Sequence, residues 1–292
     1  MRKPRRAAIA AVLWATFGSM LFIPAVGSAQ KTAEKPPEQT PYTPEVGQPG
    51  KDVVWVPTPD EVVEKMLDMA QVTRKDRVVD LGAGDGKIAI AAAKRGARAK
   101  GVEFNPDMVA LSRRNAQAAG VKVDFVQGDI FKTDFTDADV LTLYLLPELN
   151  ERLRPTILKM KPGTRVVSHQ FAMGDWEPDQ EATIGSHRAL FWRVPARVAG
   201  TWTVQIADEG GPRTVQLRLR QRYQKVEGQA TWDAAVKPVE GGVLDGPKLR
   251  FTAADASGAV HQFEADASTA GRMRGTVSTN GSAPRSFQAR RQ

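Results

Sequence analysis

The chain has 292 residues, of which 41% are hydrophobic and 25% are charged, a composition typical of a folded protein with a buried core. It contains no cysteine, which excludes a disulfide framework and a thiolate zinc site. Its three histidines, His169, His187 and His261, are far apart in the sequence and lack the spacing of metal ligands, so we expect no metal centre.

The first 29 residues have the pattern of an export signal. Basic residues precede an apolar run over residues 7–26, and the small residues Gly27, Ser28 and Ala29 follow. We expect a signal peptide over residues 1–29, cleaved after Ala29, and a mature chain in the bacterial periplasm. The alternative is an uncleaved inner-membrane anchor formed by residues 7–26, because the run approaches spanning length.

Cleavage of residues 1–29 lowers the net positive charge that would otherwise indicate a nucleic-acid partner. The formal charge of the chain is +8, and residues 1–29 hold four basic residues and no acidic one, so the remainder carries +4. Such a mild excess argues against nucleic acid as a partner. Residues 30–50 are rich in Pro, Glu, Thr and Gln without an apolar period, which predicts an extended linker.

Segments typical of helices and of strands alternate from residue 51 to residue 195. The expected elements are a helix over 60–70, a strand over 77–81, a helix over 87–95, a strand over 99–104, a helix over 105–120, strands over 122–127 and 139–145, a helix over 147–160 interrupted near Pro155, and a strand over 164–169. This alternation predicts an α/β fold, with a doubly wound, mostly parallel sheet covered by helices on both faces.

After Pro195 the pattern changes to short alternating strands separated by Gly, Asp, Pro and Asn. Six strands are expected, over 200–206, 214–223, 248–252, 260–264, 271–277 and 286–291. They predict a small all-β module, a barrel or a sandwich, over residues 196–292. The aromatic side chains on these segments are expected to fill its core: Trp202, Phe251, Phe263 and Phe287.

The first strand of the α/β domain runs into the glycine-rich turn Asp80-Leu81-Gly82-Ala83-Gly84-Asp85-Gly86. Glycines let the backbone turn tightly and approach a ligand where a Cβ atom would collide. Lys87 stands where the dinucleotide fingerprint has its last glycine, which argues against a nicotinamide dehydrogenase. An acid at Asp80 suits a ligand with an ammonium group and a positively charged sulfur.

Two further acids follow the next strands. Glu103 ends the second strand, a position beside the carboxyl end of the first strand, where an acid accepts hydrogen bonds from both ribose hydroxyls. Asp129 follows the third strand and is placed to accept from an adenine amino group, with Ile130 against the ring. Three acids at successive strand ends of one parallel sheet predict one ligand crevice.

The ordered set formed by the Asp80 glycine turn, Glu103 and Gly128-Asp129 resembles the class I, seven-strand S-adenosylmethionine-dependent methyltransferases. The flanks are similar to the non-SET protein-lysine methyltransferases, a group with mitochondrial enzymes that act on the ATP synthase c-subunit and the adenine nucleotide translocator. The segments that carry this similarity are Val56-Pro57-Thr58-Pro59, residues 88–95, Gly101-Val102-Glu103, and Trp176 with Pro178. A distant similarity to the histone lysine methyltransferase of the telomeric-silencing family is also present, and the resemblance spans residues 54–176.

The resemblance implies S-adenosyl-L-methionine as the cofactor. It assigns the methionine portion, the ribose and the adenine to a set of cofactor-binding residues: Asp80, Gly82, Ala83, Gly84, Gly86, Glu103, Phe104, Asp129 and Ile130. It places Tyr144 at methyl transfer as the catalytic residue, and the substrate channel is expected from Thr58, Pro59, Thr142, Leu145 and Pro147. The sequence reads Leu143-Tyr144-Leu145-Leu146-Pro147 where amine methyltransferases have Asn-Pro-Pro-Tyr/Phe, so we expect alignment of the acceptor rather than a dedicated base.

Three functions follow from these observations. The first is an exported methyltransferase that modifies protein lysine. The second is a methyltransferase of an envelope lipid or a small molecule, with the β module gathering an apolar acceptor. The third is a non-catalytic envelope protein that retains the cofactor and binds through its β module. Membrane proximity is open in all three, and no pattern in the sequence sets the oligomeric state.

Overall fold

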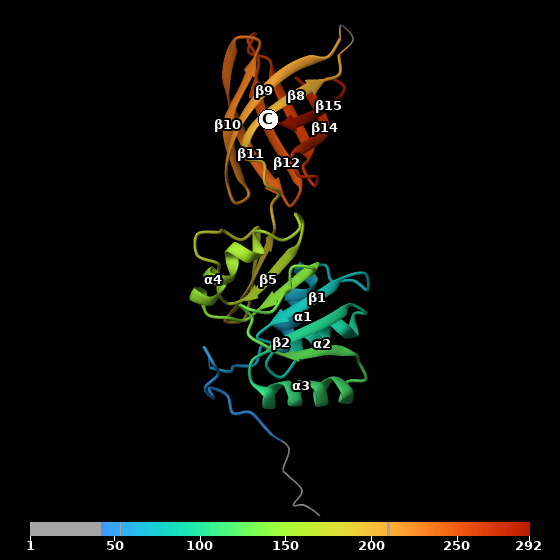
Figure 1. Ribbon diagram of the computed structural model, residues 1–292, viewed down its shortest axis with the longest axis vertical. Helices are drawn as coiled ribbons and strands as arrows, with labels where there is room; N and C mark the ends of the chain where they lie inside the picture. Colours follow the sequence, from blue (N-terminus) through green and yellow to red (C-terminus); the bar gives the residue numbers. More distant parts are fainter. Residues whose placement is uncertain (1–41, 53, 209–210) are drawn as a thin grey trace, which may run out of the picture. The chain divides into compact units, whose positions relative to one another are not determined.

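The structure is a computed structural model that describes residues 42–292, apart from residues 53 and 209–210 (Figure 1). The expected signal peptide and most of the expected linker lie outside the described residues. Within the described part of the chain, no helix is long and apolar enough to cross a membrane.

A seven-stranded sheet carries the first half of the described chain (Figure 1). Its strands are β1 (Arg77–Leu81), β2 (Arg98–Glu103), β3 (Val123–Gln127), β4 (Val140–Leu143), β5 (Arg165–His169), β6 (Gln180–Ile184) and β7 (His187–Arg193). Their order is β3-β2-β1-β4-β5-β7-β6, in which β1 to β5 are parallel and β7 is antiparallel to both of its neighbours. The predicted mostly parallel α/β sheet is therefore confirmed, and β6 and β7 extend it beyond the five strands that the sequence pattern indicated.

Helices cover both faces of the sheet because its strands alternate in side-chain direction. Val78 of β1 belongs to one apolar core, which it shares with α1 (Asp60–Met69), α2 (Lys87–Lys94) and α3 (Pro106–Ala118). Val79 belongs to the core on the other face, with α4 (Pro147–Ile157). The predicted doubly wound arrangement follows from this division.

Local signals set the helix boundaries. The Asn105 side chain caps α3 by accepting a hydrogen bond from the backbone N–H of Asp107, and Pro106 is the first helical residue, as the sequence predicts. Pro155 lies inside α4, which ends two residues later at Ile157. The helix runs through Pro155 without a break, so the expected interruption is not observed, and it ends before the expected residue 160.

Eight antiparallel strands form a closed barrel in the second half of the chain (Figure 1). They are β8 (Gly200–Ile206), β9 (Arg213–Arg222), β10 (Lys225–Trp232), β11 (Ala235–Asp245), β12 (Lys248–Ala254), β13 (Val260–Asp266), β14 (Arg272–Thr279) and β15 (Arg285–Arg291). The predicted aromatic core is confirmed, because all four expected side chains are at most 4% exposed: Trp202, Phe251, Phe263 and Phe287. The interior is thus filled by side chains.

The sequence pattern missed two of these strands, β10 and β11. Both pairings of β11 shift register, between Val226 and Gly228 on one side and between Glu240 and Val243 on the other. Such bulges break the period-two alternation by which strands are recognised in a sequence. The prediction of six strands was wrong for this reason.

Candidate active site

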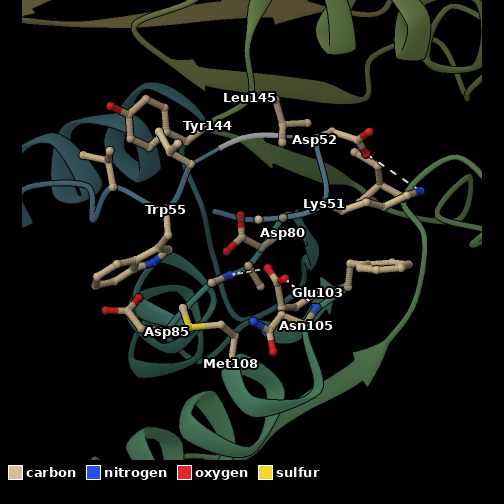
Figure 2. A pocket seen from close by; sticks show the side chains of 18 of the residues that line it. Lys51, Asp52, Trp55, Asp80, Asp85, Glu103, Asn105, Met108, Tyr144 and Leu145 are labelled. Atoms are coloured by element: carbon tan, nitrogen blue, oxygen red, sulfur yellow. Dashed lines mark hydrogen bonds and ion pairs between the residues drawn. The ribbon is translucent and has the colours of Figure 1, made fainter. Parts of the chain in front are cut away.

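The carboxyl ends of β1 to β4 enclose a cavity of about 280 Å³ (Figure 2). This size is near the lower end of small-molecule pockets, about 300–1,000 Å³. Eleven of the fifteen sequence-predicted site residues line it: Thr58, Asp80, Gly82, Ala83, Gly84, Glu103, Phe104, Asp129, Ile130, Tyr144 and Leu145. A parallel sheet gathers these residues because the loops after its strands emerge at one edge, on either side of the central strand β1.

The other four predicted residues lie outside the lining. Pro59 precedes α1, and Pro147 is the first residue of α4. Thr142 is buried within β4. Gly86 packs against the protein interior, since a Cβ atom there would lie 2.5 Å from the Phe125 ring.

The glycine turn after β1 allows close approach at two points. Gly82 and Gly84 have φ angles of 80° and 55°, a region that side chains with a Cβ atom rarely adopt. A Cβ atom on Gly84 would lie 2.8 Å from Trp55 Nε1, and one on Gly82 would lie 3.0 Å from Leu145 Cδ2. The turn therefore presents bare backbone to the cavity.

Asp80 lies at the base of the cavity and is 2% exposed. Thr142 Oγ1 donates a hydrogen bond of 2.7 Å to its Oδ1. Burial raises the pKa of the Asp80 carboxyl to about 7, and the nearby Asp85 and Glu103 carboxylates add to the rise. A cationic ligand would favour the ionised form, so binding of such a ligand is coupled to loss of this proton.

The Glu103 carboxylate is fixed by two backbone donors (Figure 2). Its Oε2 accepts from the N–H of Gly84 and its Oε1 from the N–H of Asn105, each at 2.9 Å. Each oxygen has a further lone pair. The carboxylate is thus oriented in advance to accept hydrogen bonds from a diol.

Asp129 forms an ion pair with Lys51 at the cavity wall. Lys51 Nζ lies 2.8 Å from Asp129 Oδ2, and the N–H of Phe131 donates to Asp129 Oδ1 at 2.9 Å. The Lys51 hydrogen bond lowers the pKa of Asp129, and the same contact raises the pKa of Lys51. Lys51 Nζ also lies 4.8 Å from the centre of the Phe104 ring, so the ammonium group joins two lining residues.

Lys51 belongs to a segment that the sequence pattern did not place in the site, here named the N-terminal strap, residues 47–52 and 54–56. The strap folds back on itself through hydrogen bonds from Gly47 N to Trp55 O and from Trp55 N to Gln48 O, at 2.8 and 3.0 Å. Residues 48–50, expected as the end of the linker, line the cavity with Lys51 and Trp55. The strap has no helical or strand periodicity, so its sequence pattern did not predict that it lines the cavity.

A buried histidine supports the Tyr144 side of the cavity. The rings of Tyr144 and His169 lie 3.9 Å apart, and burial raises the pKa of the Tyr144 hydroxyl. His169 Nδ1 lies 3.2 Å from Thr58 Oγ1, and burial followed by repulsion from His187 lowers the pKa of His169 to about 4. The sequence separates the two histidines, but the antiparallel pairing of β5 with β7 brings them together. Across the described residues, no group of three or more His, Asp or Glu side chains could hold a metal ion.

Comparisons with known proteins place these residues in a family. The sequence profile of the ANTKMT methyltransferase domain matches residues 80–180. A protein-lysine N-methyltransferase of Saccharolobus islandicus (strain REY15A) is 44% identical over 133 residues, covering 44% of this chain and 83% of that protein. The chain belongs to this family of S-adenosylmethionine-dependent methyltransferases.

Two further relatives of the methyltransferase match a similar share of it. The lysine N-methyltransferase of Mus musculus that is named for the ATP synthase c-subunit is 35% identical over 128 residues, covering 43% of this chain and 51% of that protein. The chain thus spans about half the length of the mouse protein. Among solved structures, an RNA methyltransferase from Salinibacter ruber in complex with S-adenosyl-L-homocysteine is 47% identical, covers 49% of this chain and 96% of that chain, and gives a TM-score of 0.48.

S-adenosylmethionine is the cofactor of the methyltransferase, and its cavity fits that molecule. The bare backbone at Gly84 admits a close approach, the Glu103 carboxylate suits a ribose diol, and Asp80 suits a positive charge. The bound cofactor supplies a methyl group already activated by its sulfonium. The protein therefore has mainly to bind, orient and exclude water.

Proposed function

We propose that the methyltransferase transfers methyl groups from S-adenosylmethionine to lysine amines of a protein substrate. The observation that carries this proposal is that one cavity contains both an apolar wall and three acids suited to the cofactor, Asp80, Glu103 and Asp129. The wall consists of Tyr144, Leu145, Leu146, Leu149 and Phe171. The relatives named for lysine methylation support the same acceptor.

The cofactor contacts follow from the site geometry. We assign the methionine portion to the backbone of Gly82 and Gly84 above Asp80, and the ribose to Glu103. Asp129 lies at the adenine end, where its Oδ1 and Oδ2 already accept from Phe131 and Lys51. An additional bond to an adenine amino group would share these oxygens, so we expect Asp129 to add less affinity than Glu103.

The acceptor amine must be neutral to attack the methyl group. An apolar surround disfavours the charged ammonium form and lowers the pKa of a lysine that enters it. Tyr144 is half-buried at the cavity wall, with its ring held by His169 and by Phe171, whose ring centre lies 6.2 Å away. We assign to Tyr144 the alignment of the amine with the methyl group, without a dedicated base.

We also propose that the protein works outside the cytoplasm. The support is the pattern of residues 1–29, in which a basic start, an apolar run and small residues follow one another. The protein substrate would then be an envelope protein. The anchored alternative, with residues 7–26 uncleaved, places the same activity at the inner membrane.

The test is transfer of a labelled methyl group from S-adenosylmethionine into fractionated envelope material. Label in protein bands, with mass spectrometry locating the added methyl groups on lysine, would support the proposal, and Glu103→Ala should reduce this label at a limiting concentration of cofactor. Label in extracted lipid or in RNA would instead assign a different acceptor. Tight cofactor binding with no labelled product in any fraction would favour a non-catalytic, cofactor-retaining protein.

A further inference from the structure

Positive charge is unevenly distributed around the barrel. The four adjacent strands β14, β15, β8 and β9 contain nine arginines and no acidic residue. The other four strands, β10 to β13, contain four basic and five acidic residues. One side of a closed barrel is thus strongly basic, whereas the opposite side is nearly balanced.

Five of the nine arginines are exposed and have neither an ion pair nor a ring contact among the described residues. We name them the arginine face: Arg218, Arg220, Arg272, Arg274 and Arg290. Arg213, Arg222 and Arg285 pair instead with Asp255, Asp175 and Asp208, and Arg291 covers the Trp202 ring.

The strand register sets how the arginine face is arranged (Figure 1 labels β9, β8, β15 and β14). At its margins, Arg220 lies opposite Glu227 and Arg274 opposite Asp266. Between β14 and β15, Arg272 and Arg290 lie directly opposite each other. Like charges opposed across a strand pair destabilise a sheet, so this pair costs stability unless an anion lies over it.

Short polar side chains separate the arginines. Thr201 on β8 lies opposite Arg218, Thr203 on β8 lies opposite Arg290, and Gln288 on β15 lies opposite Arg274. The aromatic side chains of these strands, Trp202 and Phe287, point into the barrel and are 1% and 4% exposed. The face therefore offers guanidinium groups for phosphates but no ring on which a nucleic-acid base could stack.

From these observations we propose that the arginine face binds the anionic phosphates of a phospholipid membrane. The five guanidinium groups lie on β9, β14 and β15 and can bind lipid phosphates, and attraction to anionic lipids needs only such a basic patch near the surface. The choice of lipid over nucleic acid rests on the missing stacking surface and on the proposed export of the chain, since the apolar run of residues 7–26 has the pattern of a segment that enters a membrane.

The experiment compares binding of the full chain to phosphatidylcholine vesicles with and without phosphatidylglycerol. The basic residues at positions 2–6 add to the preference for anionic vesicles in every variant, so the difference between the face variant and its control isolates the effect of the arginine face. The face variant combines Arg218→Gln, Arg272→Gln and Arg290→Gln. Its matched control, Lys237→Gln with Lys248→Gln and Arg250→Gln, removes the same charge from the balanced side of the barrel.

We expect the face variant to lose at least tenfold of the preference for anionic vesicles and the control to keep it. Added salt should weaken wild-type binding, because exposed charges are screened. Thermal unfolding of both variants checks that the barrel folds, and the face variant should be no less stable than wild type, since it separates no ion pair. Equal losses in both variants, no wild-type preference for anionic vesicles, or tighter binding to an RNA oligonucleotide that the face variant loses would each overturn the proposal.

Discussion

His169 Nε2 lies 3.0 Å from His187 Nδ1, so a buried histidine behind the active-site wall is hydrogen-bonded to a half-buried histidine at the start of β7. This hydrogen bond requires one ring nitrogen to donate and the other to accept, and a neutral His169 ring can take part in it. The His169 ring is also hydrogen-bonded to Thr58, a residue that lines the cavity. The protonation state of His169 therefore bears on the stability of the site.

Acid should destabilise the protein through His169. Its pKa is lowered to about 4 in the folded state, so the unfolded chain binds an extra proton between that value and the ordinary value near 6.5. The free energy of unfolding should fall as pH drops through this window, by on the order of 1–3 kcal/mol, and should be unaffected above it. Urea unfolding at a series of pH values measures this. His169→Gln should be less stable near neutrality and should lose the His169 part of the slope, and an identical slope in both proteins would remove the assignment.

Cofactor affinity should depend on pH through Asp80. Its folded-state pKa is raised to about 7, and a positively charged cofactor prefers the ionised carboxylate. Affinity should therefore rise with pH until it levels off somewhat above 7. Asp80→Asn should bind about tenfold more weakly above neutrality, a difference of about 1.4 kcal/mol, and without this pH dependence. Calorimetric titration with S-adenosylmethionine decides the point, and a pH-independent wild type would contradict it.

The same carboxyl should affect folding in the opposite sense to His169. Because the folded-state pKa of Asp80 lies above its unfolded value near 3.8, ionisation costs stability as pH rises from about 4 to 7 in the cofactor-free protein. Asp80→Asn removes this cost. Cofactor-free Asp80→Asn should therefore gain stability relative to wild type as pH rises through this window, and saturating cofactor should reduce the difference.

Glu103 should contribute the largest single share of cofactor affinity. A carboxylate that accepts from a diol makes charged hydrogen bonds worth about 1.5–3 kcal/mol each. Glu103→Ala should weaken S-adenosylmethionine binding at least tenfold, whereas Asp124→Ala, an exposed acid on β3, should leave it unchanged. Equal affinities for Glu103→Ala and wild type, in protein shown to be folded, would place the ribose elsewhere.

Trp55 should report cofactor binding by fluorescence. Its Nε1 lies 2.8 Å from the position that a Cβ atom on Gly84 would occupy, so a ligand on the glycine turn meets the indole ring. Four other tryptophans, at positions 176, 192, 202 and 232, are fully buried, and among the described tryptophans only Trp55 lines the cavity. Emission should change on titration with S-adenosylmethionine, and Trp55→Phe should remove the change.

Tyr144 should act on turnover rather than on cofactor binding. If its hydroxyl aligns the acceptor, Tyr144→Phe should lower kcat several-fold at unchanged cofactor affinity, and Tyr144→Ala should lower it further through loss of the ring against His169. Single-turnover methyl transfer measures the chemical step. Wild-type rates in both variants would leave the alignment to the backbone.

The sequence determined the features that short stretches of chain encode. The alternation of helices and strands, the Asn105 cap and the glycine turn depend on neighbours within a few residues, and each is visible as a local pattern. Glu103 and Asp129 could be predicted to line the same cavity because the carboxyl ends of adjacent parallel strands lie at the same edge of the sheet. The acids of the cavity and the turn beside them could therefore be predicted from the sequence.

Only the tertiary structure decided what depends on long-range contacts. The N-terminal strap reaches Asp129 through Lys51, a partner 78 residues away that no periodicity announces. His169 and His187 meet because β7 turns back antiparallel beside β5, and the arginine face exists because barrel closure places β15 next to β8. In each case the physical reason is the same: strand order and chain folding, which local residue patterns do not encode, choose which distant side chains become neighbours.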